Sequence, residues 1–193
     1  EFYTLKELEE VFDLEGLSKS PSFFDMQKLN WFNAEYIRAM PPEDFARVAE
    51  PYIRQSVTKE CYDAAAIAAV LQARCEKLTD IPEKVDFFDE LPAYDVEFFT
   101  NKKSKTNPEV CINMLNAAIP VLEGLSDWTN EAIHDALIGL AQQLEVKNAT
   151  LMWPVRIAAA GKLVTPGGAV EIFHILGKDE CLRRMRIGIE KLS

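Results

Sequence analysis

The sequence predicts an all-α protein built of two packed helical sub-bundles. Apolar residues recur at spacings of three and four in almost every segment, which is the pattern of one buried helix face. Residues that start helices precede these segments, and no segment alternates between apolar and polar positions as a half-buried strand does. A polar, proline-bearing stretch from Leu91 to Thr106 separates the two groups of helices. We therefore expect one domain over residues 1–95 and a second over residues 96–193.

The first domain opens with three expected helices. Thr4 can cap the first, which would run to Phe12. Asp25 can cap the second, whose apolar face continues to about Met40. Two prolines and two acids at residues 41–44 open the third, because proline and negative charge both suit a first helical turn.

An alanine-rich fourth helix is expected over about residues 59–77, and Pro82 starts a short fifth one. Ile67 and Leu71 lie on the buried face of the fourth helix, and Arg74 falls within the same stripe. Burying an unpaired guanidinium is prohibitive, so Arg74 needs an acceptor. The acceptor is either a carboxylate of this chain or a group that arrives from outside, and the sequence leaves both open.

Cap residues also mark the helices of the second domain. Asn107 can cap a helix in which Pro108 takes the first position and Glu109 supplies an acid, and this helix should reach about Leu122. The run Ser126–Thr129 should cap the next helix, whose apolar face is broad.

The stretch from Met152 to Met185 holds three short helical segments that two glycine-bearing turns separate. Pro154 suits the first position of a helix that Gly161 would end. Arg156 would then lie in the first turn, where the helix dipole disfavours a cation. A residue that breaks a local rule without visible compensation points to function.

The second turn of this stretch should expose backbone N–H groups at the start of the next helix, where phosphate and carbonyl oxygens bind well. Its residues are Thr165, Pro166, Gly167 and Gly168. The final helix carries Arg183, Arg184 and Arg186 beside an apolar stripe, and its spacing leaves Arg183 and Arg186 facing outward.

The net charge of −10 is unevenly distributed. Residues 151–193 hold seven Lys or Arg against four acids, so they carry +3, and residues 1–150 carry the remaining −13. Phosphate contacts dominate nonspecific affinity for nucleic acids, so the overall charge argues against indiscriminate binding. An acidic body with a basic C-terminal patch fits contact with a polyanion at one place. On charge alone, however, a solvated helix face is the simpler explanation.

No motif points to catalysis. The sequence contains no G-x-x-x-x-G-K phosphate loop and no nucleophile elbow. Four scattered cysteines and two histidines form no metal-binding pattern, so we expect neither a catalytic residue nor a metal site. No apolar run approaches the ~20 residues of a membrane span, no signal peptide opens the chain, and the cysteine usage fits a reduced, cytoplasmic compartment.

Several blocks resemble the C-terminal anticodon-binding region of bacterial-type glutamyl-tRNA synthetases, which are class I aminoacyl-tRNA synthetases. The blocks read S-K-S-P-S-F-F-D-M-Q-K-L-N-W-F-N-A-E-Y-I over residues 18–37, P-V-R-I-A-A-A-G over 154–161, T-P-G-G-A over 165–169 and L-G-K-D-E-C-L-R-R-M over 176–185. In this family an all-helical cage holds the anticodon. The resemblance implies that residues 1–95 are the end of the stem-contacting segment plus a first helical anticodon-binding subdomain. Residues 96–193 would be the second such subdomain.

The resemblance also implies a partner and a longer enzyme. The chain would bind tRNA(Glu) as a monomer in the cytoplasm, and it would bind neither DNA nor a membrane. The parent enzyme would be a glutamate–tRNA ligase that uses ATP and Mg²⁺ in a catalytic half. This chain alone would be a non-catalytic fragment without a cofactor.

Individual binding roles follow from the resemblance. Arg74 matches the arginine that reads the third anticodon base in enzymes that discriminate between tRNAs. Lys28 and Trp31 match a block near the inner angle of the tRNA, although without the resemblance Trp31 reads as a core residue. Arg156 and the turn over residues 165–168 match residues close to the anticodon bases.

Arg183 and Arg186 would add affinity without a preference for one base. Two positions depart from the family pattern. Ala160 stands where the family often has Thr, which removes a hydroxyl, and Gly168 looks like an extra residue in the turn.

Two alternatives remain open at the level of sequence. The acidic composition also fits an all-α protein-interaction module whose acidic surface docks a basic partner. Arg74, Arg156 and the T-P-G-G turn argue against this module, because an acidic docking surface does not need them. Within the resembled family, a synthetase that also charges the tRNA for glutamine is not excluded.

Overall fold

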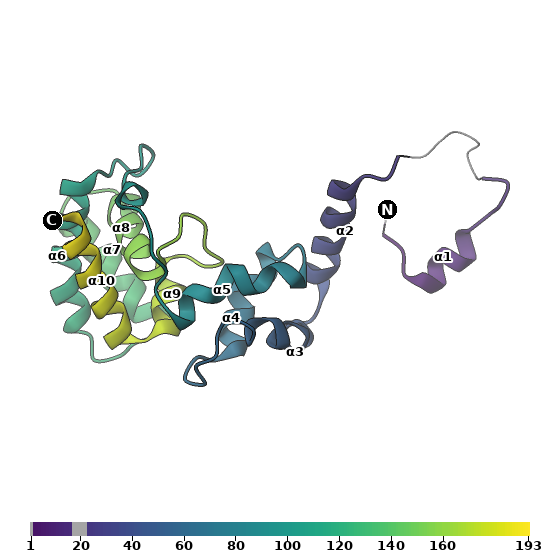
Figure 1. Cartoon of the computed structure of the whole chain (residues 1–193), viewed down its shortest axis with the longest axis horizontal. Coiled ribbons are helices and arrows are strands. Elements are labelled where there is room, and N and C mark those ends of the chain that lie inside the picture. Colours follow the sequence, from purple (N-terminus) through teal and green to yellow (C-terminus); the bar gives the residue numbers. More distant parts are fainter. Residues whose placement is uncertain (1, 17–22) are drawn as a thin grey trace.

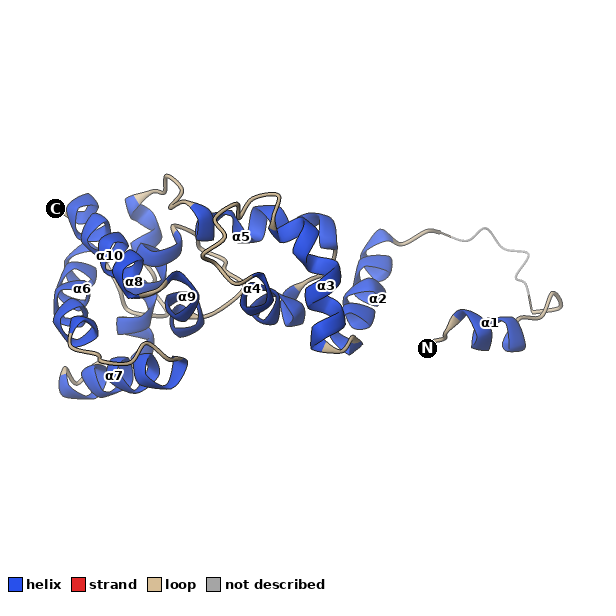
Figure 2. Ribbon diagram, turned by 90° about the horizontal axis from the view of Figure 1, so that it is seen from below, coloured by secondary structure: helices blue, strands red, loops and turns tan. Residues whose placement is uncertain are grey.

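The computed structural model describes residues 2–16 and 23–193, and its regular structure is helical (Figures 1 and 2). Within these ranges the chain forms ten α-helices and three short 3₁₀ helices. The same ranges contain no strand, only one isolated bridge between Asn101 and Thr106. The predicted all-α class is confirmed.

The molecule is elongated, with α1 and α2 at one end, α3 to α5 in the middle and α6 to α10 grouped at the other end (Figure 1). The α-helices are α1 (Leu5–Val11), α2 (Met26–Ala39), α3 (Pro42–Ile53), α4 (Ala64–Leu71), α5 (Ile81–Asp89), α6 (Pro108–Glu123), α7 (Asn130–Gln143), α8 (Asn148–Ala160), α9 (Ala169–Leu176) and α10 (Lys178–Leu192). The 3₁₀ helices are η1 (Gln72–Arg74), η2 (Leu78–Asp80) and η3 (Val96–Phe99).

Side-chain caps fix several helix starts. Thr4, Asp25, Asn107 and Thr129 each accept a backbone N–H of the following first turn, at distances of 2.9 to 3.3 Å. Each bond satisfies a donor that has no partner inside its helix. The predicted helix starts at these four residues are confirmed.

The fourth helix is shorter than expected. Asp63 caps α4, and the helix gives way after Leu71 to the 3₁₀ helix η1. The expected range of 59–77 is therefore wrong at both ends. Because a 3₁₀ turn holds three residues rather than 3.6, the side chains rotate, and Cys75 takes the next buried position while Arg74 is exposed.

Helix α8 starts earlier than expected, at Asn148, and Pro154 lies inside it. The prediction that Pro154 opens the helix is wrong. A proline there removes one backbone hydrogen bond, but the turns before it bury Thr150 and Leu151, and this burial holds the helix together. Arg156 consequently lies in the C-terminal half of α8, where the dipole no longer disfavours a cation.

One hydrophobic core runs from α2 to α10. In the C-terminal group α6 packs on α7, α8 and α10, and in the middle group α3 packs on α4 and α5. Gly188 lets α10 approach α8 closely, because a Cβ there would lie 3.1 Å from the Cβ of Ala158. The core does not break at residue 95, and the division into two domains at that point stays a prediction.

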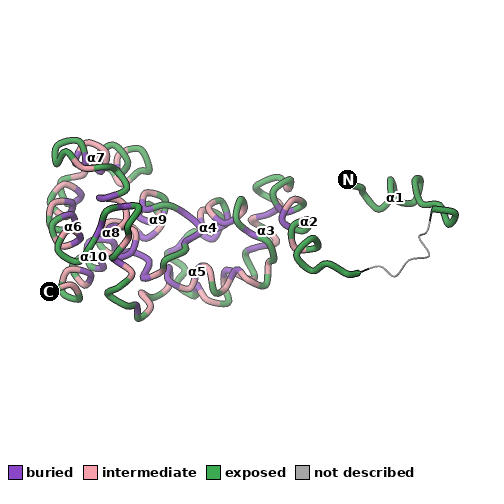
Figure 3. Tube along the Cα trace, turned by 90° about the horizontal axis from the view of Figure 1, so that it is seen from above, coloured by how far each residue is buried: buried purple, intermediate pink, exposed green. Residues whose placement is uncertain are grey.

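The N-terminal segment is packed differently. Of the 17 large hydrophobic residues that are exposed in the described ranges, 13 lie between residues 2 and 36. Helix α1 buries no residue, and its trace is exposed throughout (Figure 3). Phe2 packs against Trp31 and Tyr36 of α2. None of the described helices is both long enough and apolar enough to span a membrane.

Candidate nucleic-acid interface

Two arginines from distant parts of the chain converge on the loop between α8 and α9. Arg74 Nη1 donates to the carbonyl of Thr165 over 2.8 Å. Arg156 Nη1 donates to Thr165 Oγ1 over 2.9 Å and to the carbonyl of Leu163 over 3.1 Å. Thr165 Oγ1 in turn donates to the carbonyl of Gly167 over 2.7 Å. Both arginines are therefore held at the buried Thr165, Arg74 by its backbone carbonyl and Arg156 by its hydroxyl.

These residues line a cleft of about 310 Å³. Its walls are Arg74, Arg156, Leu163, Val164, Thr165, Gly167 and Gly168. The structure thus brings together five residues that the sequence singled out, and it buries Pro166 within the same loop. Leu163 and Val164 are exposed beside the two guanidinium groups, so the cleft combines positive charge with apolar surface.

Glycines and a lysine shape the loop. Gly161 ends α8 in the left-handed region with a φ of 62°, and a Cβ there would lie 2.8 Å from the Tyr94 ring. Lys162 then binds α5 through Asp86 at 2.5 Å. At the other end of the loop, a Cβ on Gly168 would lie 2.9 Å from Glu171 Oε2.

The environment of Arg74 differs from the expectation. Its side chain is exposed rather than part of the buried stripe, and its acceptor is a backbone carbonyl rather than a carboxylate. Lys84 of α5 donates to the Arg74 carbonyl over 3.2 Å, which fixes the backbone at this position. Both alternatives in the sequence assumed burial, which the 3₁₀ turn of η1 removes.

Arg156 is the more enclosed of the two arginines. Its guanidinium lies 4.7 Å from the centre of the Trp153 ring, and the Trp153 indole donates to the Phe98 carbonyl over 2.9 Å. Burial lowers the pKa of Arg156, and the nearby charge of Arg74 lowers it further. Among the described residues neither arginine forms an ion pair with a carboxylate. Two cations therefore share the cleft, and their local acceptors are uncharged oxygens.

A larger cavity of about 710 Å³ adjoins the cleft and shares Arg156 and Gly168 with it. Met152 and Trp153 of α8 supply apolar surface to this cavity, and His134 of α7 also lines it. The sequence reasoning did not assign Trp153 to a site. Its signal was its place three residues before Arg156, which puts both on one face of a helix that continues through Pro154.

The other four predicted residues lie away from the cleft. Lys28 and Trp31 are on α2, where half of Trp31 is exposed and the rest packs on aromatic neighbours. Arg183 and Arg186 face outward on α10, but Glu180 binds Arg183 at 2.7 Å and Glu123 binds Arg186. Their roles in RNA binding stay predictions.

In the described part of the chain, no group of three or more His, Cys, Asp or Glu side chains is arranged to hold a metal ion.

Two groups with strongly shifted pKa values, Tyr94 and Cys111, lie in the hydrophobic core and not in the cleft. Burial raises the pKa of Tyr94 to about 12 and that of Cys111 to about 11.

Known proteins resemble this chain over its whole length. The chain is 47% identical over 193 residues to a glutamate–tRNA ligase of Clostridium tetani and 45% identical over 193 residues to that of Clostridium acetobutylicum. Each match covers the whole chain but only 39% and 40% of the relative, so the chain spans about two fifths of their length.

A crystal structure of a glutamate tRNA ligase from Elizabethkingia meningosepticum, in complex with its amino acid, matches with a TM-score of 0.81 and 25% identity. That match covers 99% of this chain and 37% of the other. The family model described as the anticodon binding domain matches residues 44–189, which is well over half of the chain. The chain therefore belongs to the anticodon-binding domain family.

Proposed function

We propose that this chain is the anticodon-binding part of a glutamate–tRNA ligase, and that the cleft between Arg74 and Arg156 receives anticodon bases of tRNA(Glu). The observation that carries the proposal is the convergence of two arginines, without a carboxylate partner in the described structure, on Thr165. Such a site attracts an anion and offers guanidinium donors to a base edge.

Arg74 is proposed to read the third anticodon base. Cytosine presents two acceptors, O2 and N3, on its pairing edge, whereas guanine presents N–H donors at the corresponding places. Arg74 uses Nη1 to bind Thr165, and its other N–H groups remain to serve a base. Proteins read single-stranded RNA loops in this way, through splayed bases and their pairing edges.

Arg156 and the adjoining cavity are proposed to supply affinity rather than choice of base. Trp153 and Met152 offer flat and apolar surface on which a base can stack, and the Arg156 charge lies beside it. Lys28 and Trp31 would contact the tRNA nearer its inner angle. Arg183 and Arg186 would contribute weakly, because each already has a carboxylate partner.

The activity of the longer protein is part of the proposal. The parent would be a glutamate–tRNA ligase of the cytoplasm that uses ATP and Mg²⁺, and it would act as a monomer. The isolated chain is proposed to be non-catalytic and to need no cofactor, because its sequence carries no adenylate-forming signature. It should therefore show no glutamate-dependent exchange between ATP and pyrophosphate.

The test uses two RNA hairpins that carry a tRNA(Glu)-type anticodon loop and differ only in C or G at the third anticodon position. We expect the chain to prefer C, and Arg74→Gln to reduce that preference by about one to two decades in the affinity ratio, the range of a bidentate contact. Arg47→Gln is the matched control, because Arg47 is an exposed arginine on α3 whose partner is Asp44. Fluorescence anisotropy at several salt concentrations measures both affinities.

Two results would contradict the proposal. An unchanged C-over-G ratio in Arg74→Gln would mean that Arg74 only holds the Thr165 loop. Absence of salt-sensitive RNA binding, together with binding to basic peptides, would favour the all-α interaction module with an acidic docking surface.

A further inference from the structure

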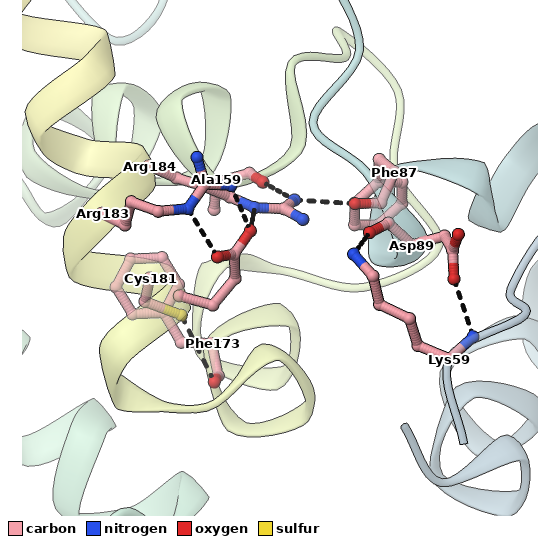
Figure 4. A network of polar contacts seen from close by, with 9 residues as sticks. Lys59, Phe87, Asp89, Ala159, Phe173, Cys181, Arg183 and Arg184 are labelled. Carbon is pink, nitrogen blue, oxygen red and sulfur yellow. Dashed lines mark hydrogen bonds and ion pairs between the residues drawn. The ribbon is translucent and has the colours of Figure 1, made fainter. Parts of the chain in front are cut away.

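Arg184 is fully buried and joins three helices (Figure 4). Its Nη1 donates to the carbonyl of Phe87 over 2.7 Å and to the carbonyl of Ala159 over 2.6 Å. Its Nε donates to Glu180 Oε1 over 2.6 Å, one turn earlier in α10. Phe87 belongs to α5 and Ala159 to α8, so one guanidinium connects three elements that are far apart in the sequence.

Both carbonyls lie in the last turn of their helices, since α5 ends at Asp89 and α8 at Ala160. The final carbonyls of an α-helix have no partner within the helix, and they carry the negative end of its dipole. A buried cation between two such ends satisfies both of them at once. Arg184 is therefore placed to fix the distance and the angle between α5 and α8.

The same two helices lead to the two sides of the cleft. Helix α8 runs directly into the loop that carries Thr165. Helix α5 holds the backbone of Arg74 through Lys84 at 3.2 Å, and it binds Lys162 through Asp86 at 2.5 Å. The hydrogen bond of Lys84 and the ion pair of Lys162 are both accessible to solvent, which weakens such contacts. The contact at Arg184 is fully buried, so water does not screen it.

A stabilising role does not account for Arg184 well. Its Nη2 is buried and has no hydrogen-bond partner among the residues that the structure describes. A buried donor without a partner costs free energy, and well-packed hydrophobic residues often serve a core as well as a buried ion pair does. What a hydrophobic residue cannot do is bind two carbonyls in a fixed direction.

We propose that Arg184 is a positioning residue, which locks α5 to α8 and thereby sets the place of Arg74 opposite the Thr165 loop. Its effect on base reading rests on the proposed function, whereas its effect on the two helices does not. Loss of the guanidinium should let the α2–α5 region move relative to the α6–α10 region.

The test compares Arg184→Met with Arg54→Met. Methionine keeps an unbranched apolar stem but donates no hydrogen bond, and Glu180 keeps Arg183 as its partner, so no buried carboxylate is left alone. Arg54 is the matched control. It also donates to backbone carbonyls, those of Val57 at 3.5 Å and of Lys59 and Tyr62 at 3.2 Å each, but all three lie on the α2–α5 side. Arg184→Lys keeps the positive charge but replaces the planar guanidinium with one ammonium group.

The first measurement does not involve RNA. Spin labels are placed on cysteines introduced at the exposed Glu50 of α3 and Gln142 of α7, with the exposed Cys61 changed to Ser. Double electron–electron resonance should give a broadened or shifted distance distribution for Arg184→Met, an intermediate one for Arg184→Lys and the parent distribution for Arg54→Met. Identical distributions for Arg184→Met and Arg54→Met would overturn the proposal. If Arg184→Met does not fold, the same criterion applies to Arg184→Lys against Arg54→Lys.

The second measurement is the C-over-G affinity ratio for the two hairpin RNAs. We expect Arg184→Met to reduce the ratio about tenfold, Arg184→Lys to restore part of it and Arg54→Met to leave it unchanged. If the C-over-G affinity ratio is unchanged in Arg184→Met although the distance between the spin labels has shifted, the link between Arg184 and base reading is overturned. A parent chain without any preference for C would contradict the proposed function instead, and the distance measurement would still decide the positioning role.

Discussion

Arg156 and Arg184 occupy two enclosed regions of the same molecule, and their surroundings differ in one respect. Each guanidinium donates to backbone carbonyls, at 3.1 Å for Arg156 and at 2.6 and 2.7 Å for Arg184. Arg184 also has Glu180 at 2.6 Å, whereas the charged neighbour of Arg156 is another cation, Arg74. For this pair, a carboxylate partner separates the arginine that joins helices from the one that is available to an anion.

The pKa shifts express the same contrast. Burial and the charge of Arg74 lower the pKa of Arg156, so its charged form is disfavoured in the free protein. Glu180 belongs to the helix junction, by which we mean Arg184 and its partners on α5, α8 and α10. Hydrogen bonds from Arg183 lower the pKa of Glu180, and the hydrogen bond and charge of Arg184 lower it further. Burial acts in the opposite direction, and the resulting pKa is about 2. The Glu180 carboxylate is therefore ionised at neutral pH and pairs with Arg183 and Arg184, whereas the two cations of the cleft have no carboxylate partner in the described structure.

The largest expected effect concerns the backbone that supports the cleft. Gly161→Ala places a Cβ 2.8 Å from the Tyr94 ring at a positive φ, so it should reduce the free energy of unfolding by about 2–4 kcal/mol. Gly177→Ala shows the effect of backbone strain without a contact. It has no heavy atom within 4 Å, but its φ of 81° and ψ of 161° lie in a region that essentially only glycine adopts, and it should cost about 1–3 kcal/mol. Chemical denaturation measures both, and a loss in Gly161→Ala below about 1 kcal/mol, which the left-handed backbone alone accounts for, would show that the contact with Tyr94 does not matter.

The second effect is a pH dependence at the helix junction. The pKa of Glu180 falls from 4.5 to about 2 on folding, so its contribution is fully present above pH 4.5 and is lost as the pH falls toward 2. Because Glu180 is partly exposed, we expect a contribution of about 1–2 kcal/mol. Glu180→Gln should therefore be less stable than the parent at pH 7, and the difference should shrink as the pH falls from 4.5. A difference that stays constant over this range would contradict the shift.

The smallest effect concerns arginines that belong to neither region. Arg183→Ala and Arg186→Ala should weaken binding of both hairpin RNAs equally and by less than about threefold, because Glu180 and Glu123 already neutralise them at the surface. The salt dependence of binding provides the measurement. A slope reduced by a full unit in either variant would show that the arginine leaves its carboxylate to contact a phosphate.

The sequence predicted the helical class because the signals for it are local. Caps such as Asp25, Asn107 and Thr129 act within four residues, and the apolar spacing acts within two turns. Pro154 shows the limit of such rules. Proline at a first helical position is only a local preference, and the tertiary burial of Thr150 and Leu151 extended α8 past it.

The site was predicted less completely than the fold. The sequence singled out Arg74 and Arg156, and the structure brings them together at one cleft, while their roles in binding stay predictions. The physical reasons given for both were wrong, since Arg74 is exposed and Arg156 lies far from the first turn of α8. The spacing in the final helix left Arg184 out of the outward-facing pair Arg183 and Arg186, but nothing in the sequence assigned Arg184 a role. Only the carbonyls of Phe87 and Ala159, 97 and 25 residues away, give Arg184 its role.

The two like charges in the cleft also link folding to binding. Their mutual repulsion lowers the stability of the free chain, and a bound polyanion removes that cost while it binds only the folded state. The free energy of unfolding must then rise with the logarithm of the anion concentration once that concentration exceeds the dissociation constant. Under the proposed function, the free energy of unfolding of this domain would report the concentration of its RNA ligand.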